Sequence, residues 1–275
     1  MEKSALTVAV IVTTYNRPDA LAAVLEGYLA QNNAAFELII ADDGSTEATR
    51  GVVAEYAARA PFPVKHVWQE DRGFRAAAVR NRALAATQAD YIIFTDGDCI
   101  PQNDFVTRHC RLAARERFLS GNRILLSEAF TREILERKLP VHEWSLFCWL
   151  NARIGGRINR WLPLIRFPDG DWRTAAPQRW EGAKTCNLSA WRADLLQVNG
   201  LDEVYSGWGL EDSDLVIRLL HAGITHKSAR FAAPVLHLWH RENDRSRFTE
   251  NRRLLDELIA SRRFRAQLGV DQYLS

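Results

Sequence analysis

Short runs of β-branched and aromatic residues alternate with amphipathic segments over the first 110 residues, and this alternation constrains the fold more than any other feature. The runs occupy residues 7–13, 36–41, 64–68 and 91–96. The first and last are nearly continuous apolar runs, which are typical of strands buried on both faces. The segments between the runs repeat apolar residues at helical spacing. Strand and helix in regular succession predict an α/β fold with a Rossmann-like, mostly parallel sheet flanked by helices.

Polar residues cluster directly after three of the four predicted strands, at 13–17, 42–46 and 96–98. In a doubly wound sheet ligands bind beyond the carboxyl ends of the strands, so we expect the three clusters to form one site. The sequence has no G-x-G-x-x-G after the first strand and no G-x-x-x-x-G-K-[ST], the fingerprints of dinucleotide-binding and P-loop proteins. A nucleotide in this site would therefore be held by carboxylates and a metal ion rather than by a glycine-rich loop.

The third cluster, Asp96-Gly97-Asp98, delivers two carboxylates into a turn at the end of a buried strand. Such a pair can hold a hard divalent cation from one side and leave the other side open for phosphate oxygens. Asp-Gly-Asp is also ordinary turn chemistry, so the tripeptide alone does not decide between a metal site and a simple turn.

A second acidic group lies at the start of a predicted helix in the second half of the chain. Gly207-Trp208-Gly209 precedes Glu211 and Asp212, and apolar residues at helical spacing follow until Gly223. Acidic residues in a first helical turn are favoured by the helix dipole, which is the structural explanation for them. Two glycines around a tryptophan additionally suit a mobile lid over a ligand.

Two histidines, His237 and His240, end a later apolar segment. A single histidine in this position would most often be a core or surface residue. Two of them, together with Asp98, suggest a mixed oxygen and nitrogen metal site that suits Mn²⁺ as well as Mg²⁺. The tail at 251–268 then has the spacing of an arginine-rich amphipathic helix, whose polar face would be either solvated or bound to anionic lipid.

Residues 131–166 interrupt the alternation with a basic and aromatic segment. It carries seven Arg or Lys against three Glu, interleaved with tryptophans and other large apolar residues. One interpretation is a surface that contacts an anionic membrane or a lipid-linked substrate. The other is a helical insert that packs its tryptophans into the core. Some helix is expected in either case, since a structureless loop of this length is uncommon in a compact domain.

Composition places the chain among ordinary globular proteins. Its 275 residues are 47% hydrophobic and carry a formal net charge of +2, so charge gives no support for nucleic acid, and we expect no nucleic-acid partner. The four cysteines show no C-x-x-C spacing, which suits reduced core thiols in a reducing compartment. The sequence shows neither a signal-peptide pattern nor an apolar run of about 18 residues, so we expect a cytoplasmic protein.

Three segments of the first half, VIVTTYNRPDAL, LIIADDGST and YIIFTDGDCIP, together strongly resemble the family 2 glycosyltransferases, whose nucleotide-sugar domain has the GT-A fold. Three later segments, GAKTCNLSAWR, VNGLDEVYSGWGLEDSDLVIRLLHAG and LHLWH, resemble the C-terminal half shared by β-1,4-galactosyltransferase-type and bacterial chondroitin-polymerase-like enzymes. The resemblance covers residues 5 to 250. It implies a GT-A domain in which 1–110 binds the nucleotide sugar and 111–275 supplies the acceptor side and completes the metal site.

The resemblance also implies an activity. It is the inverting, metal-dependent transfer of a hexose or N-acetylhexosamine from a UDP-sugar to a saccharide acceptor, free or lipid-linked, of the lipopolysaccharide or capsule type. Mn²⁺ or Mg²⁺ would be the cofactor, and the protein would work in the cytoplasm, at the inner face of the membrane if the acceptor is lipid-linked. The alternatives are a catalytically inactive nucleotide-sugar-binding module and a nucleotidyltransferase of similar fold.

Roles carry over to this chain by position in the family's motifs. In the family the first polar cluster and the Asp-Asp-Gly-Ser turn contact the uridine and basic residues meet the nucleotide, while the Asp-x-Asp meets the donor sugar and the metal. The corresponding nucleotide-sugar residues here are Thr13, Tyr15, Arg17, Asp43, Arg75, Asp96 and Trp208, the last as a lid. The implied metal ligands are Asp98, His240 and His237. The implied general base is Asp212, with Glu211 positioning the acceptor. Since animal enzymes of this type have methionine at the position of His237, the preferred metal stays open.

Overall fold

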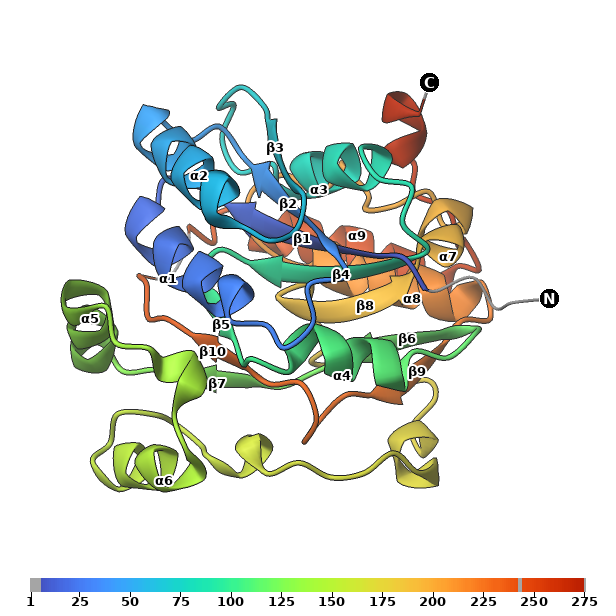
Figure 1. Cartoon of the computed structure of the whole chain (residues 1–275). Helices are drawn as coiled ribbons and strands as arrows, with labels where there is room; N and C mark the ends of the chain where they lie inside the picture. The colour runs from blue at the N-terminus through green and yellow to red at the C-terminus, as the bar shows by residue number, and fades with distance from the viewer. Residues whose placement is uncertain (1–5, 242–243, 275) are drawn as a thin grey trace.

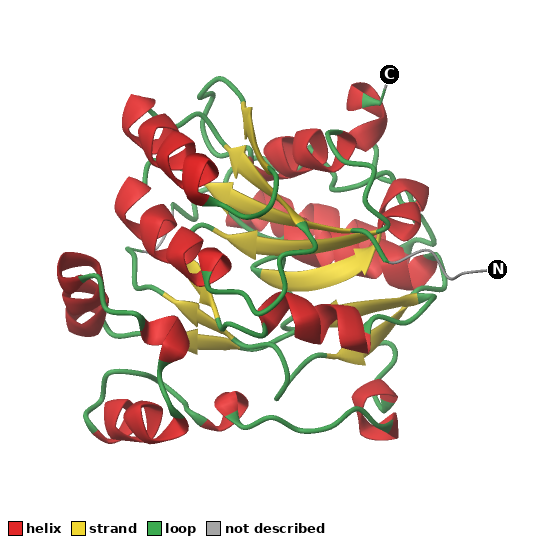
Figure 2. Ribbon diagram, viewed as in Figure 1, coloured by secondary structure: helices red, strands yellow, loops and turns green. Residues whose placement is uncertain are grey.

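A seven-stranded mixed sheet, with helices on both faces, forms the centre of the molecule (Figures 1 and 2). This computed structural model describes residues 6–241 and 244–274. The strand order is β3-β2-β1-β4-β8-β6-β9, and the first four strands in this order are parallel. These four are β1 (Val8–Thr14), β2 (Glu37–Asp42), β3 (Val64–Trp68) and β4 (Tyr91–Asp96). The prediction of an α/β fold with a mostly parallel sheet is therefore confirmed.

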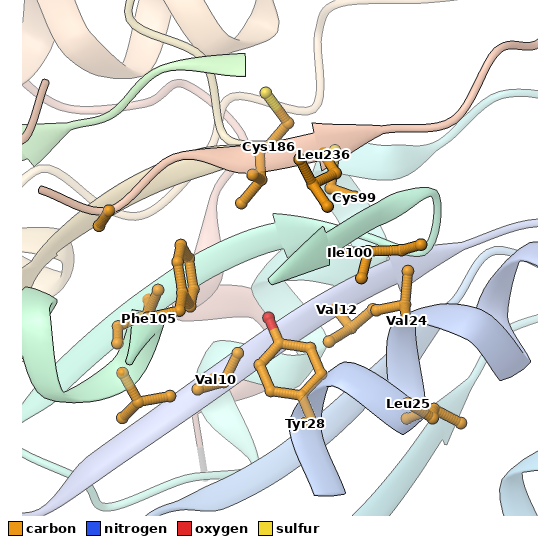
Figure 3. Close-up of a cluster of buried hydrophobic side chains, with 14 of the residues drawn as sticks. Val10, Val12, Val24, Leu25, Tyr28, Cys99, Ile100, Phe105, Cys186 and Leu236 are labelled. Carbon is orange, nitrogen blue, oxygen red and sulfur yellow. The ribbon is translucent and has the colours of Figure 1, made fainter. Parts of the chain in front are cut away.

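Three helices connect these strands, as the periodicity predicts. They are α1 (Pro18–Leu29), α2 (Glu47–Arg59) and α3 (Ala76–Ala85). Because side chains alternate along a strand, β1 sends Val10 and Val12 toward α1 and the intervening Ile11 toward α3. Figure 3 shows the first of these contacts, with Tyr28 of α1 against β1. Burial on both faces explains why the β1 sequence is continuously apolar.

The second half of the chain completes the sheet with an antiparallel strand that the sequence did not indicate. That strand is β8 (Asn187–Trp191), which pairs with β4 and with β6 (Arg117–Ser120), and β9 (Thr225–Ser228) closes the edge. Three helices lie next to these strands along the chain, α4 (Phe105–Leu112), α7 (Arg192–Gln197) and α8 (Glu211–His221). The start of α8 at Glu211 confirms that the acidic pair lies in a first helical turn.

A separate three-stranded sheet joins the Asp-Gly-Asp turn to the late histidines. It is formed by β5 (Cys99–Pro101), β10 (Val235–His237) and β7 (Arg123–Leu125). His237 pairs with Cys99 across the antiparallel β5–β10 ladder, and the Leu238 amide donates to the Asp98 carbonyl at 2.8 Å. This register fixes the histidine segment beside the turn, although the two are far apart in sequence.

The basic insert contains α5 (Glu128–Arg137), a 3-10 turn at Val141–Glu143, α6 (Leu146–Ile154) and a 3-10 turn at Leu162–Leu164. Trp149 is fully buried, and Trp144 packs against Phe130 of α5. The expectation that tryptophans pack into the core is met for these two residues. A further 3-10 turn, Asp171–Thr174, precedes β8. Among the described helices, none has the length and apolar character needed to cross a bilayer.

The C-terminal helix is shorter than predicted. Helix α9 spans Phe248–Ala260 and a 3-10 turn spans Val270–Tyr273, so the predicted helix over 251–268 is wrong beyond residue 260. The reason is Asp202, whose buried carboxylate accepts hydrogen bonds from the amides of Gln267 and Leu268 and from the Arg263 side chain. These bonds hold the segment after α9 in an irregular conformation over the loop that precedes α8.

All four cysteines are free, and two of them depart from the expectation of core thiols. Cys99 and Cys186 are buried, whereas Cys110 is half-buried and Cys148 is exposed on α6.

Candidate active site

The Asp-Gly-Asp turn gives its two carboxylates different partners. Strand β4 ends at Asp96, which accepts a hydrogen bond from Arg80 Nη2 at 2.9 Å. Asp98 instead faces the two imidazoles of the histidine segment. Gly97 is required between them, because a Cβ there would lie 2.9 Å from the Thr14 side chain. The turn is therefore packed against β1 and aims one acid at an arginine and the other at two histidines.

Asp98, His237 and His240 form a donor set that suits a divalent cation. The Nε2 atoms of His240 and His237 lie 3.4 Å and 3.9 Å from Asp98 Oδ2. His240 Nδ1 is 2.7 Å from the Arg241 carbonyl, which can only accept, so Nδ1 carries the proton. In the neutral ring the lone pair of Nε2 then faces the Asp98 carboxylate, and a cation between them would satisfy both groups. Burial lowers the pKa of His237, which favours the neutral, coordinating form of its imidazole.

A thiol borders this donor set. Cys99 Sγ lies 3.4 Å from Asp98 Oδ1, and Cys99 pairs with His237 across the β5–β10 ladder. Ligand atoms of Asp98, Cys99 and His237 all lie within 4.8 Å of one another. Burial raises the pKa of the Cys99 thiol well above its usual value, so in the metal-free protein it is protonated.

Arg80 of α3 connects the two acidic motifs, and the sequence reasoning missed it. Its guanidinium lies 2.9 Å from Asp96, 3.5 Å from Glu211 and 3.8 Å from Asp212, and its Nε donates to Thr13 Oγ1 at 2.9 Å. The side chain is only 5% exposed. A signal was present in the sequence, because Arg80 falls on the same helical face as the buried Ala77 and Leu84, where an arginine needs acidic partners.

Glu211 and Asp212 occupy the first turn of α8, under Arg80. Thr185 donates its hydroxyl to Asp212 Oδ1, which fixes the orientation of this carboxylate. Burial raises the pKa of Glu211 to about 7; Asp212 adds to the shift and Arg80 opposes it. Burial likewise raises the pKa of Asp96 to about 6 against the opposing effect of Arg80. Three carboxyl groups thus converge on one arginine, and two of them hold protons more readily than an exposed acid does.

The loop before α8 has the backbone that the glycines predict. Gly207 and Gly209 have φ values of +72° and +108°. Asn251 of α9 donates its side-chain amide to the carbonyls of Ser206 and Gly209. Between these anchored points Trp208 is half-buried, with the Arg245 guanidinium 5.4 Å from its ring.

The predicted uridine residues lie at the carboxyl ends of β1 and β2. The buried Asp43 accepts from Gln69 Nε2 at 2.6 Å and from the Arg75 amide at 2.7 Å, while burial raises its pKa. Tyr15 is half exposed and donates to Asp71 at 2.8 Å. The structure therefore places these side chains at the carboxyl edge of the sheet, the edge that also carries the Asp-Gly-Asp turn.

The two predicted basic residues make local contacts. Arg17 Nε bonds Asp19 at 2.9 Å, and Arg75 Nη2 lies 3.9 Å from Glu203. Both stand at helix starts on the site edge, Arg17 before α1 and Arg75 before α3.

Two models of known protein families match the chain. The model of glycosyl transferase family 2 matches residues 9–164, more than half of the chain. The chain belongs to glycosyl transferase family 2. A second family model, described as the N-terminal domain of galactosyltransferase, matches residues 174–241 of this glycosyltransferase. The second match contains Glu211, Asp212 and both histidines, so the two models divide the site between them.

Named relatives are glycosyltransferases that are longer than this one. Validoxylamine A glucosyltransferase from Streptomyces hygroscopicus subsp. limoneus is 32% identical over 237 residues, which cover 78% of this chain and 48% of the relative. Chondroitin synthase from Escherichia coli is 26% identical over 239 residues, covering 82% of this chain and 34% of that enzyme. The chain thus spans half or less of the length of these relatives.

Solved structures show that the fold is GT-A. The mannosyltransferase PcManGT from Pyrobaculum calidifontis, in complex with GDP-Man and Mn²⁺, superposes with a TM-score of 0.58 at 18% identity, covering 86% of this chain and 57% of the other. S. aureus TarS 1-349, in complex with UDP-GlcNAc, gives a TM-score of 0.63 at 15% identity, covering 98% of this chain and 69% of the other.

Proposed function

We propose that this glycosyltransferase is an inverting, metal-dependent enzyme that moves a hexose or N-acetylhexosamine from a UDP-sugar to a saccharide acceptor. The observation that carries the proposal is the position of Arg80, within 2.9 Å of Asp96 and 3.8 Å of Asp212. The donor-side turn and the acid proposed as base therefore face each other across one guanidinium. In this division of labour residues 1–110 hold the donor, while 111–275 supply the acceptor side and the histidine ligands.

The proposed mechanism depends on the groups that lie on each side of the anomeric carbon of the donor sugar. Asp212, oriented by Thr185, takes the proton from the acceptor hydroxyl as that oxygen attacks the anomeric carbon. The bond to the UDP oxygen breaks on the opposite face, which inverts the configuration. Glu211 positions the acceptor, and Asp96 binds the donor sugar or ribose. Trp208 covers the site and excludes water, the competing nucleophile.

Asp98, His240 and His237 would hold the cation, Mn²⁺ or Mg²⁺. When bound, the cation neutralises negative charge that develops on the departing diphosphate. Arg17 and Arg75 add positive charge at the same edge, and Thr13, Tyr15 and Asp43 hold the uridine. The complexes of neighbouring folds with GDP-Man and Mn²⁺, and with UDP-GlcNAc, support a nucleotide-sugar donor and a divalent metal.

The proposed acceptor is a saccharide of the lipopolysaccharide or capsule type, free or lipid-linked. The chondroitin synthases among the relatives support a saccharide acceptor. We place the enzyme in the cytoplasm, at the inner face of the membrane, and its four free cysteines fit a reducing compartment.

The proposed function is tested in two steps, first by identifying the donor and then by measuring turnover. A thermal-shift screen of UDP-sugars with Mn²⁺ identifies the donor, because a ligand that binds the native state raises its stability. Released UDP is then measured with a panel of saccharide acceptors. We expect UDP and no pyrophosphate, which would instead indicate a nucleotidyltransferase. Donor binding without any release of UDP would indicate an inactive binding module.

Asp212→Asn tests the base. It should abolish acceptor-dependent release of UDP while donor binding stays intact, and Glu211→Gln should raise the KM for acceptor more than it lowers kcat. Transfer by Asp212→Asn at near wild-type rate would overturn the assignment, and loss of kcat in Glu211→Gln alone would move the base to Glu211.

A further inference from the structure

Helix α6 presents an apolar face to solvent. Only Trp149 and Ala152 of its nine residues are buried. Phe147 is 70% exposed and Ile154 is 77% exposed, with Leu146 at 49% and Leu162 of the following turn at 55%. Figure 1 shows α6 at the outside of the molecule, away from the central sheet. An exposed patch of large apolar side chains on one short helix is typical of a surface that binds a partner.

The segment that carries this face has charge of one sign. Residues 144–166 contain four arginines and neither Asp nor Glu. Arg157 pairs with Glu133 at 3.4 Å and Arg166 with Asp104 at 2.9 Å. For Arg153 and Arg160, the part of the chain that the structure describes offers no acidic group within ion-pair distance. Two exposed, uncompensated cations therefore flank the apolar side chains.

We propose that this face, defined by Leu146, Phe147, Ile154 and Leu162 with Arg153 and Arg160, docks on the surface of an anionic lipid bilayer. The apolar side chains enter the boundary between headgroups and acyl chains, and the arginines lie at the level of the lipid phosphates. The insert thus combines both sequence interpretations, since Trp144 and Trp149 pack inward while the four apolar side chains of the face are exposed.

Charge favours a bilayer over a second copy of the chain. In a two-fold dimer built on this face the same surface meets itself. Arg153 and Arg160 would then be brought toward their own copies without acidic partners, which is unfavourable when they are desolvated. Anionic headgroups supply the missing negative charge, whereas a second copy does not.

Ring packing and one hydrogen bond connect the face to the proposed metal site. Trp144 and Trp149 of the insert pack on Phe130 of α5 at ring distances of 5.5 Å and 6.5 Å. The next residue, Thr131, accepts a hydrogen bond from the amide of Trp239 at 2.8 Å. Trp239 lies between His237 and His240. Docking through α6 therefore fixes the orientation of the histidine segment relative to the bilayer, and this arrangement suits a lipid-linked acceptor.

This inference deepens the proposed acceptor and location, but it does not require transfer to occur. Its test is co-sedimentation of the full chain with vesicles of phosphatidylcholine alone or with phosphatidylglycerol, at low and physiological salt. We expect binding to the anionic vesicles and little to the neutral ones. Phe147→Ser/Ile154→Ser and Arg153→Glu/Arg160→Glu should each lower the apparent partition coefficient at least tenfold.

Matched controls change similar surface residues elsewhere. Phe264→Ser removes an aromatic ring that is 39% exposed, and Arg111→Glu/Arg262→Glu makes the same change in charge at two other exposed arginines. Both should bind within about twofold of wild type. Because all these positions are exposed, the variants should fold, and an unchanged unfolding temperature verifies it.

Three results would overturn the docking surface. One is absence of wild-type binding to anionic vesicles, and another is equal binding of the α6 variants. The third is a wild-type dimer in light scattering that Phe147→Ser/Ile154→Ser converts to a monomer, which would assign the face to a second copy. Donor binding in solution is measured separately, so a failure here leaves the proposed transferase activity standing, and the converse also holds.

Discussion

Arg80→Met should destabilise the metal-free protein by about 3–5 kcal/mol at neutral pH, the usual effect of removing one partner from a buried ionic cluster. The substitution keeps an unbranched side chain of similar length but removes hydrogen bonds of 2.9 Å to Asp96 and Thr13. It also leaves Asp96 and Glu211 without their shared cation. For a domain of this size, the loss corresponds to a fall in Tm on the order of 10 °C.

The pH dependence of this stability loss shows whether the buried carboxyl groups cause it. Burial already raises the pKa of Asp96 to about 6 and that of Glu211 to about 7, and Arg80 opposes both shifts. Without the arginine both pKa values rise further. A carboxyl group whose pKa is raised in the folded state costs no stability below its unfolded pKa and costs most above its folded pKa. The deficit of Arg80→Met should therefore be larger at pH 8 than at pH 5.

The assay is urea unfolding at pH 5 and pH 8 with a chelator present. Arg82→Met is the control, because this arginine of the same helix is exposed and stacks on the Tyr273 ring at 4.6 Å. We expect a control deficit of about 1 kcal/mol or less that does not change with pH. A deficit for Arg80→Met that is equally small, or that is the same at both pH values, would refute the proposed role of Arg80.

Four further substitutions test other parts of the site. Ionisation of Glu211 should contribute up to about 3 kcal/mol to a loss of unfolding free energy between pH 4.5 and 7, beside the contribution of Asp96, and Glu211→Gln should make the loss in urea titrations smaller by up to that amount. His240→Ala and His237→Ala should each weaken Mn²⁺ binding at least about tenfold in calorimetric titrations, and unchanged affinity would exclude that histidine as a ligand. Gly209→Ala should cost about 1–3 kcal/mol, because φ at this position is +108°, and a Tm within 1 °C of wild type would contradict the strain.

The first half of the fold follows from local patterns, because each of its elements carries its own signal. The strand at Val8–Thr14 is recognisable from its apolar run, and the acids at Asp42–Asp43 and Asp96 follow strands whose ends must share an edge. The antiparallel strand at Asn187–Trp191 has no such regular neighbours. Its place beside β4 depends on pairing over a long sequence separation, which periodicity does not encode.

The site residues likewise differ in how far the sequence alone reveals them. Asp98 and His240 are recognisable as candidate ligands by residue type, but only the β5–β10 ladder brings them within 3.4 Å. Arg80 is harder to recognise, because its helix is rich in alanine and also carries the exposed Arg82. The helical spacing shows only that Arg80 shares a face with buried residues, not which acids it contacts. Its role is visible only in the structure, where Asp96 and Glu211, from different halves of the chain, both lie beside its guanidinium.

Calorimetric titration of UDP into the protein, with Mn²⁺ and then with a chelator, tests the central claim most directly. If Asp98 and the two histidines hold a cation that contacts the diphosphate, UDP should bind in the presence of Mn²⁺. Affinity should fall at least about tenfold with the chelator, and likewise in Asp98→Asn with Mn²⁺ present. UDP binding that is equally tight without metal, or the absence of UDP binding under both conditions, would contradict the account of this chain as a metal-dependent UDP-sugar transferase.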